Sequence, residues 1–414
     1  MKTCASAAGS APRSRMATRS RSSRRSPGGE ASSSSGRRPP WHAVVSASAS
    51  IQMKQWLETR QVLDRLAELR RAGTRSALAT VVRVRGSAYR HEGAKLLVAE
   101  DGSATGNVSG GCLERDVRDV ALEVIRSGTP QRRSYCSGAD EIAAWDLGVG
   151  CEGEVEVFVE PAPVPMHLER ELLEGREAFA VCTAIPGKGE EGRGKRVVVT
   201  SATAEGDLGS PALTTAGIVR ARALLREERS ALEEIAGHTV FIDVLVPPPE
   251  LVVFGAGDDA RPLVRCAADV GFRAIVVDRR PGYLTAERFP AAARLVQSDA
   301  AQLSERLTLD ESSYAVVMTH NFADDMAYAG ALLETTVAYI GMLGPRERTE
   351  RILRDVGSGS RDTVRVYGPV GLDIGTDGAE QVALSVVAEI LAVRSGRRAR
   401  SLRERGVPIH APGD

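Results

Sequence analysis

The chain is poor in several features that would restrict its function. Aromatic residues make up 4% of its 414 residues, and its six cysteines never occur as C-x-x-C pairs. Dilute cysteines without such pairs argue against a disulfide scaffold or a structural zinc site, and they indicate a reducing compartment. No apolar run reaches the roughly 18 residues that a transmembrane helix needs, so the sequence predicts a cytoplasmic protein without membrane association.

The chain also lacks a net charge, because 54 Lys and Arg residues balance 54 Asp and Glu residues. The distribution is uneven. Residues 1–50 hold nine Lys or Arg and one acid, Glu30, which leaves 45 basic against 53 acidic residues in the remainder. A mildly acidic folded part lacks the clustered positive surface that binds phosphates, so the sequence predicts no nucleic-acid partner.

Residues 1–52 are rich in Ser and Arg and contain no apolar segment of a secretory signal. Two interpretations stay open. The segment is either an organellar transit peptide or an upstream extension of the reading frame with Met53 as the true start, and we favour the second. In both cases it is too polar to bury a core, and we predict it to be disordered.

Hydrophobic periodicity predicts an α/β chain whose N-terminal part has two sections. A helix is expected directly after Met53, and further helices begin at Leu113 and Ala216. Strands are expected at 77–84, 95–99, 154–160, 178–185 and 196–200. The strand, strand, helix order occurs twice, as in an internal repeat, although unrelated α/β segments can share it. We assign residues 53–165 to an N-terminal domain and 166–249 to its second part, which ends in a Pro-rich linker.

After the three consecutive prolines at 247–249 the pattern changes to alternating strands and helices. Strands are expected at 251–255, 274–278, 294–296, 314–319, 337–341 and 364–367, and helices at 260–270 and 380–394. The near-continuous apolar character of the strands is typical of a parallel sheet that is buried on both faces. Residues 250–396 are therefore predicted to form a Rossmann-like domain, and 397–414 a basic tail.

Gly255 and Gly257 belong to a G-x-G-x-x-A motif between a predicted strand and a predicted helix, and Asp278 follows about 20 residues later. Such glycines let a phosphate approach backbone N–H groups at the positive end of a helix. Asp258 and Asp259, however, place two carboxylates where a diphosphate would lie. NAD(P) binding and a plain helix cap both remain open.

A second candidate site is Gly110-Gly111-Cys112-Leu113-Glu114, a glycine loop that begins a helix. A thiol at a helix N-terminus is stabilised as thiolate, which makes it a better nucleophile and soft-metal ligand. The alternative is a cysteine that serves only as a small buried apolar residue. Cys151 lies in another glycine-rich loop and could face Cys112 if the strands pack together.

Three further groups are candidates for ligand binding. Arg85 and Arg90 lie in a loop that suits an anion, although a solvated turn has the same composition. His320 follows a predicted strand at its carboxyl end, where open α/β sheets bind their ligands. Gly371 and Asp373 lie in a Gly- and Pro-containing loop after the last strand, at the same edge.

Several segments between residues 53 and 394 resemble, in order, the XdhC/CoxI family of accessory proteins that mature xanthine dehydrogenase and related molybdenum hydroxylases. They include ATVVRVRGSAYRHEGAKLLV, GNVSGGCLE, GVGCEGEVEVFVEP, VVFGAGDDARPLV and GPVGLDIGTDGAEQVALSVVAEI. The resemblance implies an α/β fold with an N-terminal XdhC-type domain followed by a C-terminal Rossmann-like parallel-sheet domain. It also implies a chaperone rather than an enzyme.

Such a protein would bind molybdenum cofactor, as molybdopterin or its cytidine dinucleotide form. It would support sulfuration by a cysteine desulfurase and deliver the cofactor to a xanthine dehydrogenase-type apo-enzyme. A homodimer is also implied, with Cys112 as a thiolate close to the molybdenum. An NAD(P)-dependent oxidoreductase that uses Asp278 and His320 is the alternative. The predicted cofactor-binding residues are Cys112, Gly110, Gly111, Glu114, Arg85, Arg90, Cys151, Gly255, Gly257, Asp278, His320, Gly371 and Asp373.

Overall fold

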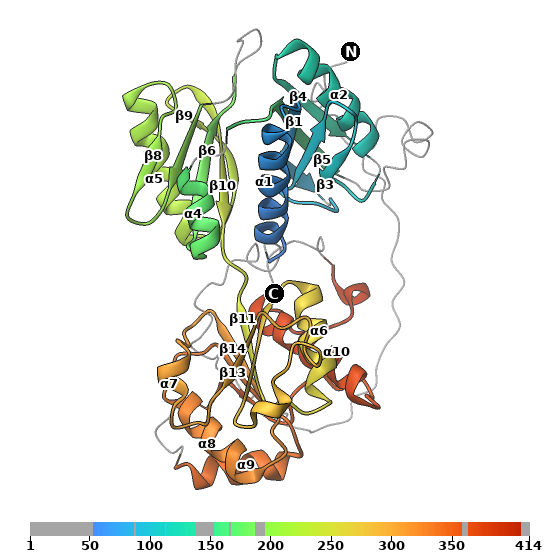
Figure 1. Cartoon of the computed structure of the whole chain (residues 1–414), viewed down its shortest axis with the longest axis vertical. Coiled ribbons are helices and arrows are strands. Elements are labelled where there is room, and N and C mark those ends of the chain that lie inside the picture. Colours follow the sequence, from blue (N-terminus) through green and yellow to red (C-terminus); the bar gives the residue numbers. More distant parts are fainter. Residues whose placement is uncertain are drawn as a thin grey trace, which may run out of the picture. The chain divides into compact units, whose positions relative to one another are not determined.

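The computed structural model describes residues 53–86, 88–111, 113–136, 153–164, 167–186, 195–357 and 363–406. Within these ranges the chain forms three β-sheets, two antiparallel and one parallel (Figure 1). The predicted leader 1–52 lies outside the described residues. None of the helices in the described ranges is long and apolar enough to span a membrane.

The first sheet is antiparallel, with strand order β3-β2-β1-β5-β4. Its strands are β1 (Ser76–Gly86), β2 (Lys95–Ala99), β3 (Ala104–Gly106), β4 (Gln131–Cys136) and β5 (Gly153–Pro161). Helix α1 (Gln55–Arg71) packs Leu63 and Leu66 against Leu78 and Leu97 of one sheet face. Helix α2 (Glu114–Ser127) packs on the opposite face of the same sheet, against the residues that alternate with Leu78 and Leu97 along their strands. Helix α2 therefore lies against β1, β2 and β5.

The second sheet repeats this topology, with strand order β8-β7-β6-β10-β9. Its elements are α4 (His167–Gly175), β6 (Phe179–Ala184), β7 (Arg196–Val199), β8 (Ala204–Gly206), α5 (Pro211–Arg226), β9 (Ala231–Ile235) and β10 (His238–Leu245). Strands β6 to β10 occupy the same positions in the second sheet as β1 to β5 occupy in the first. The repeated order in the sequence therefore corresponds to a repeated fold.

Helix α5 begins five residues before the predicted Ala216. Ser210 caps it by accepting a hydrogen bond from the Leu213 backbone N–H, and Pro211 takes the first helical position. Thr214 and Thr215 separate the buried Leu213 of the first turn from the apolar residues that follow, which is why the hydrophobic pattern alone placed the start too late.

The third sheet is parallel, with strand order β13-β12-β11-β14-β15-β16. This is the 3-2-1-4-5-6 order of doubly wound dinucleotide-binding folds, so the predicted Rossmann-like domain is confirmed. Its strands are β11 (Glu250–Phe254), β12 (Arg273–Asp278), β13 (Arg294–Gln297), β14 (Ser313–Val317), β15 (Tyr339–Met342) and β16 (Val366–Tyr367).

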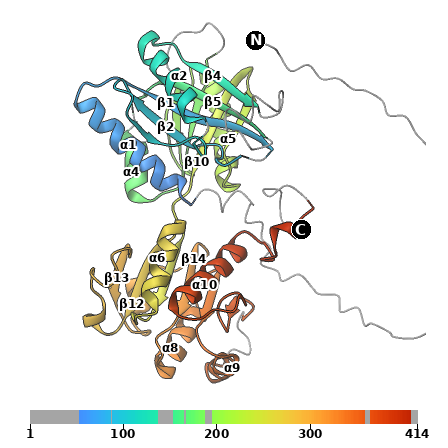
Figure 2. The same ribbon diagram turned by 90° about the vertical axis from the view of Figure 1, so that its right-hand side faces the viewer.

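Helices cover both faces of this parallel sheet (Figure 2). One face carries α6 (Ala260–Val270) and α10 (Ala379–Arg394), and the other carries α7 (Leu303–Arg306), α8 (Phe322–Leu333) and α9 (Arg346–Asp355). The apolar strands are buried on both faces, as predicted.

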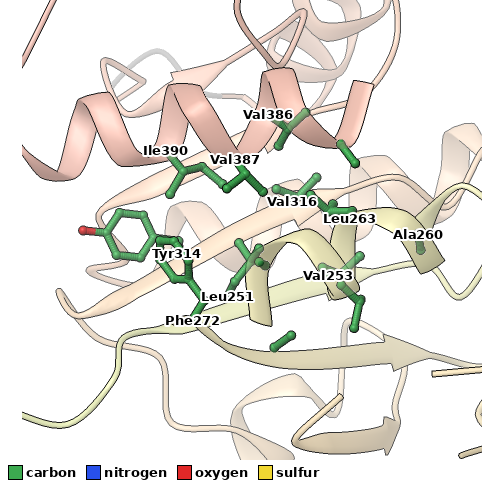
Figure 3. Close-up of a cluster of buried hydrophobic side chains, with 14 of the residues drawn as sticks. Leu251, Val253, Ala260, Leu263, Phe272, Tyr314, Val316, Val386, Val387 and Ile390 are labelled. Carbon is green, nitrogen blue, oxygen red and sulfur yellow. The ribbon is translucent and has the colours of Figure 1, made fainter. Parts of the chain in front are cut away.

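The packing of α10 holds the dinucleotide-type motif in place. Val387 and Ile390 of α10 lie over Leu251 and Leu263, which come from β11 and α6 (Figure 3). Burying each such side chain contributes at most about 1.5–3 kcal/mol. Because α6 packs against both the sheet and the neighbouring α10, its N-terminus is fixed at the carboxyl edge of the strands.

Candidate functional site

A pocket of about 240 Å³ lies at the carboxyl edge of the parallel sheet, between the ends of β12 and β14. It contains two predicted site residues, Asp278 and His320, although the sequence separates them by more than 40 positions. The lining residues are Asp278, Arg279, Arg280, Thr319, His320, Asn321, Asp324 and Tyr328. Such a position at the edge of an open parallel sheet is where this fold class binds ligands.

Both carboxylate oxygens of Asp278 are occupied by donors of this chain. One oxygen accepts from the Ala256 backbone N–H and from Arg280 Nη2, both at 2.8 Å. The other accepts from the backbone N–H and Nε of Arg280, both at 2.9 Å. Burial opposes ionisation, but these hydrogen bonds outweigh it and lower the pKa of Asp278. A nucleotide ribose would have to displace Arg280 to reach this carboxylate.

The lowered pKa of Asp278 makes part of the domain's stability depend on pH. The ionised form stabilises the fold above the ordinary carboxyl pKa of 3.8, and this contribution is lost as the pH falls through the lower folded-state pKa. We expect Asp278→Asn to lower the urea midpoint at pH 7 and to differ less from the native protein near pH 3. Asp373→Asn is the control, because Asp373 is exposed. Equal destabilisation of Asp278→Asn at both pH values would contradict this account.

The glycine motif brings two strand ends close together. Gly255 has φ of +114°, and a Cβ atom there would lie 2.5 Å from the Met318 carbonyl oxygen at the end of β14. Only glycine combines that backbone conformation with so close an approach. The motif therefore has a structural role at this edge, in addition to any role in binding a ligand.

The carboxylates at the start of α6 are already paired within the domain. Asp258 accepts a hydrogen bond from Arg288 at 3.0 Å, and Asp259 accepts one from His320 Nε2 at 2.6 Å. His320 holds this position with a left-handed φ of 59°. In dinucleotide-binding domains this helix end receives the diphosphate, and carboxylates in its place repel phosphate. The local charge therefore disfavours NAD(P).

The second candidate site, the glycine–cysteine loop before α2, is held by Ser109. Its Oγ accepts from the backbone N–H of Gly111 at 3.0 Å and of Leu113 at 3.1 Å. Its hydroxyl donates to Glu114, which also accepts from the Ser109 backbone N–H at 2.8 Å. Burial opposes ionisation of Glu114, but the hydrogen bonds from Ser109 outweigh it and lower its pKa. The residues on either side of position 112 are thus fixed.

Cys112 and Cys151 themselves lie outside the described residues. The two cysteine side chains that the structure describes are unsuited to thiolate chemistry. Burial raises the pKa of Cys182 to about 12, and burial and then Asp269 raise that of Cys266. Within the described ranges no three His, Cys, Asp or Glu side chains could jointly hold a metal ion.

The arginines of the predicted anion loop do not converge on one point. Arg85 pairs with Glu154 at 3.2 Å, and Arg90 pairs with Glu58 of α1. The notable side chain of this loop is instead Tyr89, which is 71% exposed. Its ring borders Gly110, where an added Cβ would lie 3.3 Å from the Tyr89 ring.

Gly371 and Asp373 do not line the pocket at the sheet edge. The backbone N–H of Gly371 donates to Glu389 of α10 at 3.0 Å, and Asp373 is exposed. Six lining residues are absent from the predicted set: Arg279, Arg280, Thr319, Asn321, Asp324 and Tyr328. The two arginines directly follow Asp278, so their adjacency to that acid was the available signal.

Comparison with known proteins assigns the family. Residues 251–390 match the XdhC Rossmann domain, and residues 69–136 match the XdhC and CoxI family. A Bacillus subtilis (strain 168) protein described as a probable xanthine dehydrogenase subunit is 34% identical, over 77% of this chain and 93% of that protein. The chain therefore belongs to the XdhC and CoxI family.

Two further similarities extend over most of the chain. The molybdenum cofactor insertion chaperone PaoD of Escherichia coli (strain K12) is 25% identical, over 81% of this chain and 88% of that protein. A crystal structure described as a xanthine dehydrogenase from Bacillus halodurans matches with a TM-score of 0.68 and 29% identity. That match covers 83% of this chain and 98% of the other. Both candidate sites, apart from Cys151, lie within the two matched family regions.

Proposed function

We propose that this chain is a cytoplasmic chaperone of molybdenum cofactor, which it binds as cargo and delivers to a xanthine dehydrogenase-type apo-enzyme. It acts as a homodimer and supports sulfuration of the cofactor by a cysteine desulfurase. Family membership supports this proposal, as do the relatives described as a molybdenum cofactor insertion chaperone and as part of a xanthine dehydrogenase.

The observation that carries the proposal is the difference between the two repeated modules. In the first module, residues 107–113 separate the end of β3 from α2; in the second, residues 207–210 separate the end of β8 from α5. The same topology therefore forms with a loop that is three residues shorter and contains no cysteine. The longer loop is not required by the fold, which favours a functional role for Gly110, Gly111 and Cys112.

A thiol at position 112 suits this cargo chemically. Thiolates are soft ligands that prefer metal–sulfur centres, and the start of a helix stabilises them. A ligand can approach the backbone of the exposed Gly110 and Gly111 without steric hindrance from side chains. Glu114 and Ser109 shape the loop, and Cys112 is the group proposed to lie nearest the molybdenum.

The edge of the parallel sheet is the second part of the proposed binding surface, through Gly255, Gly257, Asp278 and His320. The strand order and the G-x-G-x-x-A motif also favour a second candidate, an NAD(P)-dependent oxidoreductase. The paired carboxylates at the start of α6 and the occupied Asp278 weigh against that candidate. It would also leave the cysteine loop without a use.

Tyr89 is expected to contribute a planar face beside the cysteine loop. Stacking of a heterocycle on an aromatic side chain is worth about 1–3 kcal/mol, so Tyr89→Ala should weaken cofactor binding about tenfold. Tyr89→Phe keeps the ring and should bind as the native protein does. Quenching of pterin fluorescence measures the affinity, and Val219→Ala, which removes another exposed apolar side chain on α5, is the control. Unchanged affinity of Tyr89→Ala would contradict this role.

The proposal is tested by identifying what the protein carries. The full chain is purified from a host that makes abundant molybdenum cofactor, and released small molecules are analysed by mass spectrometry together with molybdenum content. We expect a pterin in near-stoichiometric amount, as molybdopterin or its cytidine dinucleotide. Stoichiometric nicotinamide without pterin would select the oxidoreductase instead.

A further inference from the structure

A groove of about 440 Å³ runs along β13 at the margin of the parallel sheet, and it shares one lining residue, Arg279, with the pocket between β12 and β14. Figure 2 labels β13 beside β12, and β13 is the terminal strand in the order of this sheet. The residues that line the groove are Arg279, Arg294, Leu295, Val296, Gln297, Ser298, Asp299, Gln302 and Arg306.

The lining shows that this groove follows the strand's open edge. All four residues of β13, from Arg294 to Gln297, contribute to it. Successive side chains of a strand point to opposite faces of the sheet, so a groove on one face would touch only alternate residues. The other edge of β13 is paired with β12. Four residues of parallel strand span roughly 13 Å, enough for a short extended segment.

The charge of the groove selects one sign of ligand. Its lining contains three guanidinium groups, on Arg279, Arg294 and Arg306, and one carboxylate, on Asp299. These arginines come from three places: the turn after β12, β13 itself and α7. The Asp299 carboxylate accepts from the Gln302 backbone N–H at 3.0 Å, and Arg279 pairs with Asp324 at 2.9 Å. Arg294 Nη2 donates to the Arg306 carbonyl oxygen at 3.2 Å. The positive charge beside the open strand edge is therefore carried by Arg294 and Arg306, which pair with no carboxylate among the described residues.

We propose that the open edge of β13 is a docking site for an acidic, extended segment of a partner protein, which adds to the sheet as a further strand. Backbone hydrogen bonds to the strand edge would supply affinity, and carboxylates paired with Arg294 and Arg306 would supply specificity. This inference does not depend on the cargo of the protein.

A labelled ten-residue peptide in which glutamate and valine alternate tests the proposal, with binding followed by fluorescence anisotropy against the full chain. The double variant Arg294→Glu/Arg306→Glu should bind about tenfold more weakly, because two exposed ion pairs become repulsive. The matched control is Arg346→Glu/Arg354→Glu on α9, which changes the net charge equally at two exposed positions away from the groove. The control should bind as the native protein does.

Strand addition also requires backbone hydrogen bonds between the peptide and β13, whereas simple charge attraction does not. The same peptide, N-methylated at every residue, cannot donate backbone hydrogen bonds from either edge and should lose binding. Hydrogen exchange of residues 294–297 should slow when the unmodified peptide is present. Equal binding of the methylated peptide, or equal weakening by the α9 control, would overturn the proposal.

Charged side chains also protect open strand edges from self-association. If the arginines serve only that purpose, Arg294→Ala/Arg306→Ala should self-associate on size-exclusion chromatography, while the native protein does not bind the acidic peptide. That combination would also overturn the proposal.

Discussion

Cys112→Ala is expected to abolish the protein's support of cofactor sulfuration while leaving its fold intact. In a host that lacks its own copy of this protein, xanthine dehydrogenase activity should fall by at least about tenfold, because alanine supplies no thiolate. The loop should keep its shape, since the Ser109 hydrogen bonds use the backbone of Gly111 and Leu113 rather than the side chain at 112.

The control is Cys266→Ala, which removes a half-buried thiol whose pKa is raised and which lies outside the loop. Circular dichroism verifies that both variants are folded. Native-level activity with Cys112→Ala would show that the loop acts without its thiol, and the proposed role of Cys112 would be wrong.

Gly255→Ala is expected to destabilise the Rossmann-like domain by about 3 kcal/mol, because it combines a left-handed backbone with overpacking. The added Cβ would lie 2.5 Å from the Met318 carbonyl oxygen, 2.8 Å from its carbon and 2.9 Å from the Thr319 Cα. All three are backbone atoms, which cannot move aside as the end of a side chain can. Separation of the two strand ends would also displace His320, which follows Thr319.

Urea denaturation measures this effect. Gly282→Ala is the matched control, because a Cβ there meets no atom within 4 Å and the residue has no left-handed φ. Gly257→Ala is an intermediate case, since its nearest neighbour is the movable Asp259 carboxylate. If Gly255→Ala were as stable as Gly282→Ala, the close approach of β11 and β14 would not constrain the site as described.

Helices and strands with strong hydrophobic periodicity and a terminating residue nearby were predictable from the sequence. The prediction for α6, 260–270, matches the structure, because its apolar face is pronounced and Gly271 ends it in a left-handed conformation. β2 was likewise predicted with its observed bounds. β3, β4, β8, β9 and β10 were missed. β3 and β8 have three residues each, and β4 and β9 show no apolar alternation. The apolar residues of β10 from Val240 to Leu245 were a signal that went unread.

The candidate site was less predictable than the fold, because its pairings are tertiary. The contact of Asp259 with His320 joins residues 61 positions apart, and it forms only because α6 begins and β14 ends at the same edge of the sheet. Arg85 and Arg90 show the opposite case, in which residues close in the sequence do not form a common site. Their spacing indicates a shared anion site, but each is paired with an acid on a different element, Glu154 of β5 and Glu58 of α1.

The central proposal, that this protein delivers molybdenum cofactor, is tested most directly by transfer. Protein loaded with sulfurated cofactor is mixed with cofactor-free xanthine dehydrogenase in the presence of an excess of a competing pterin-binding protein that traps released cofactor. The account predicts that xanthine oxidation appears in proportion to the loaded protein added. Activity that is lost whenever the trap is present would mean that the cofactor merely dissociates, and would contradict delivery by this chain.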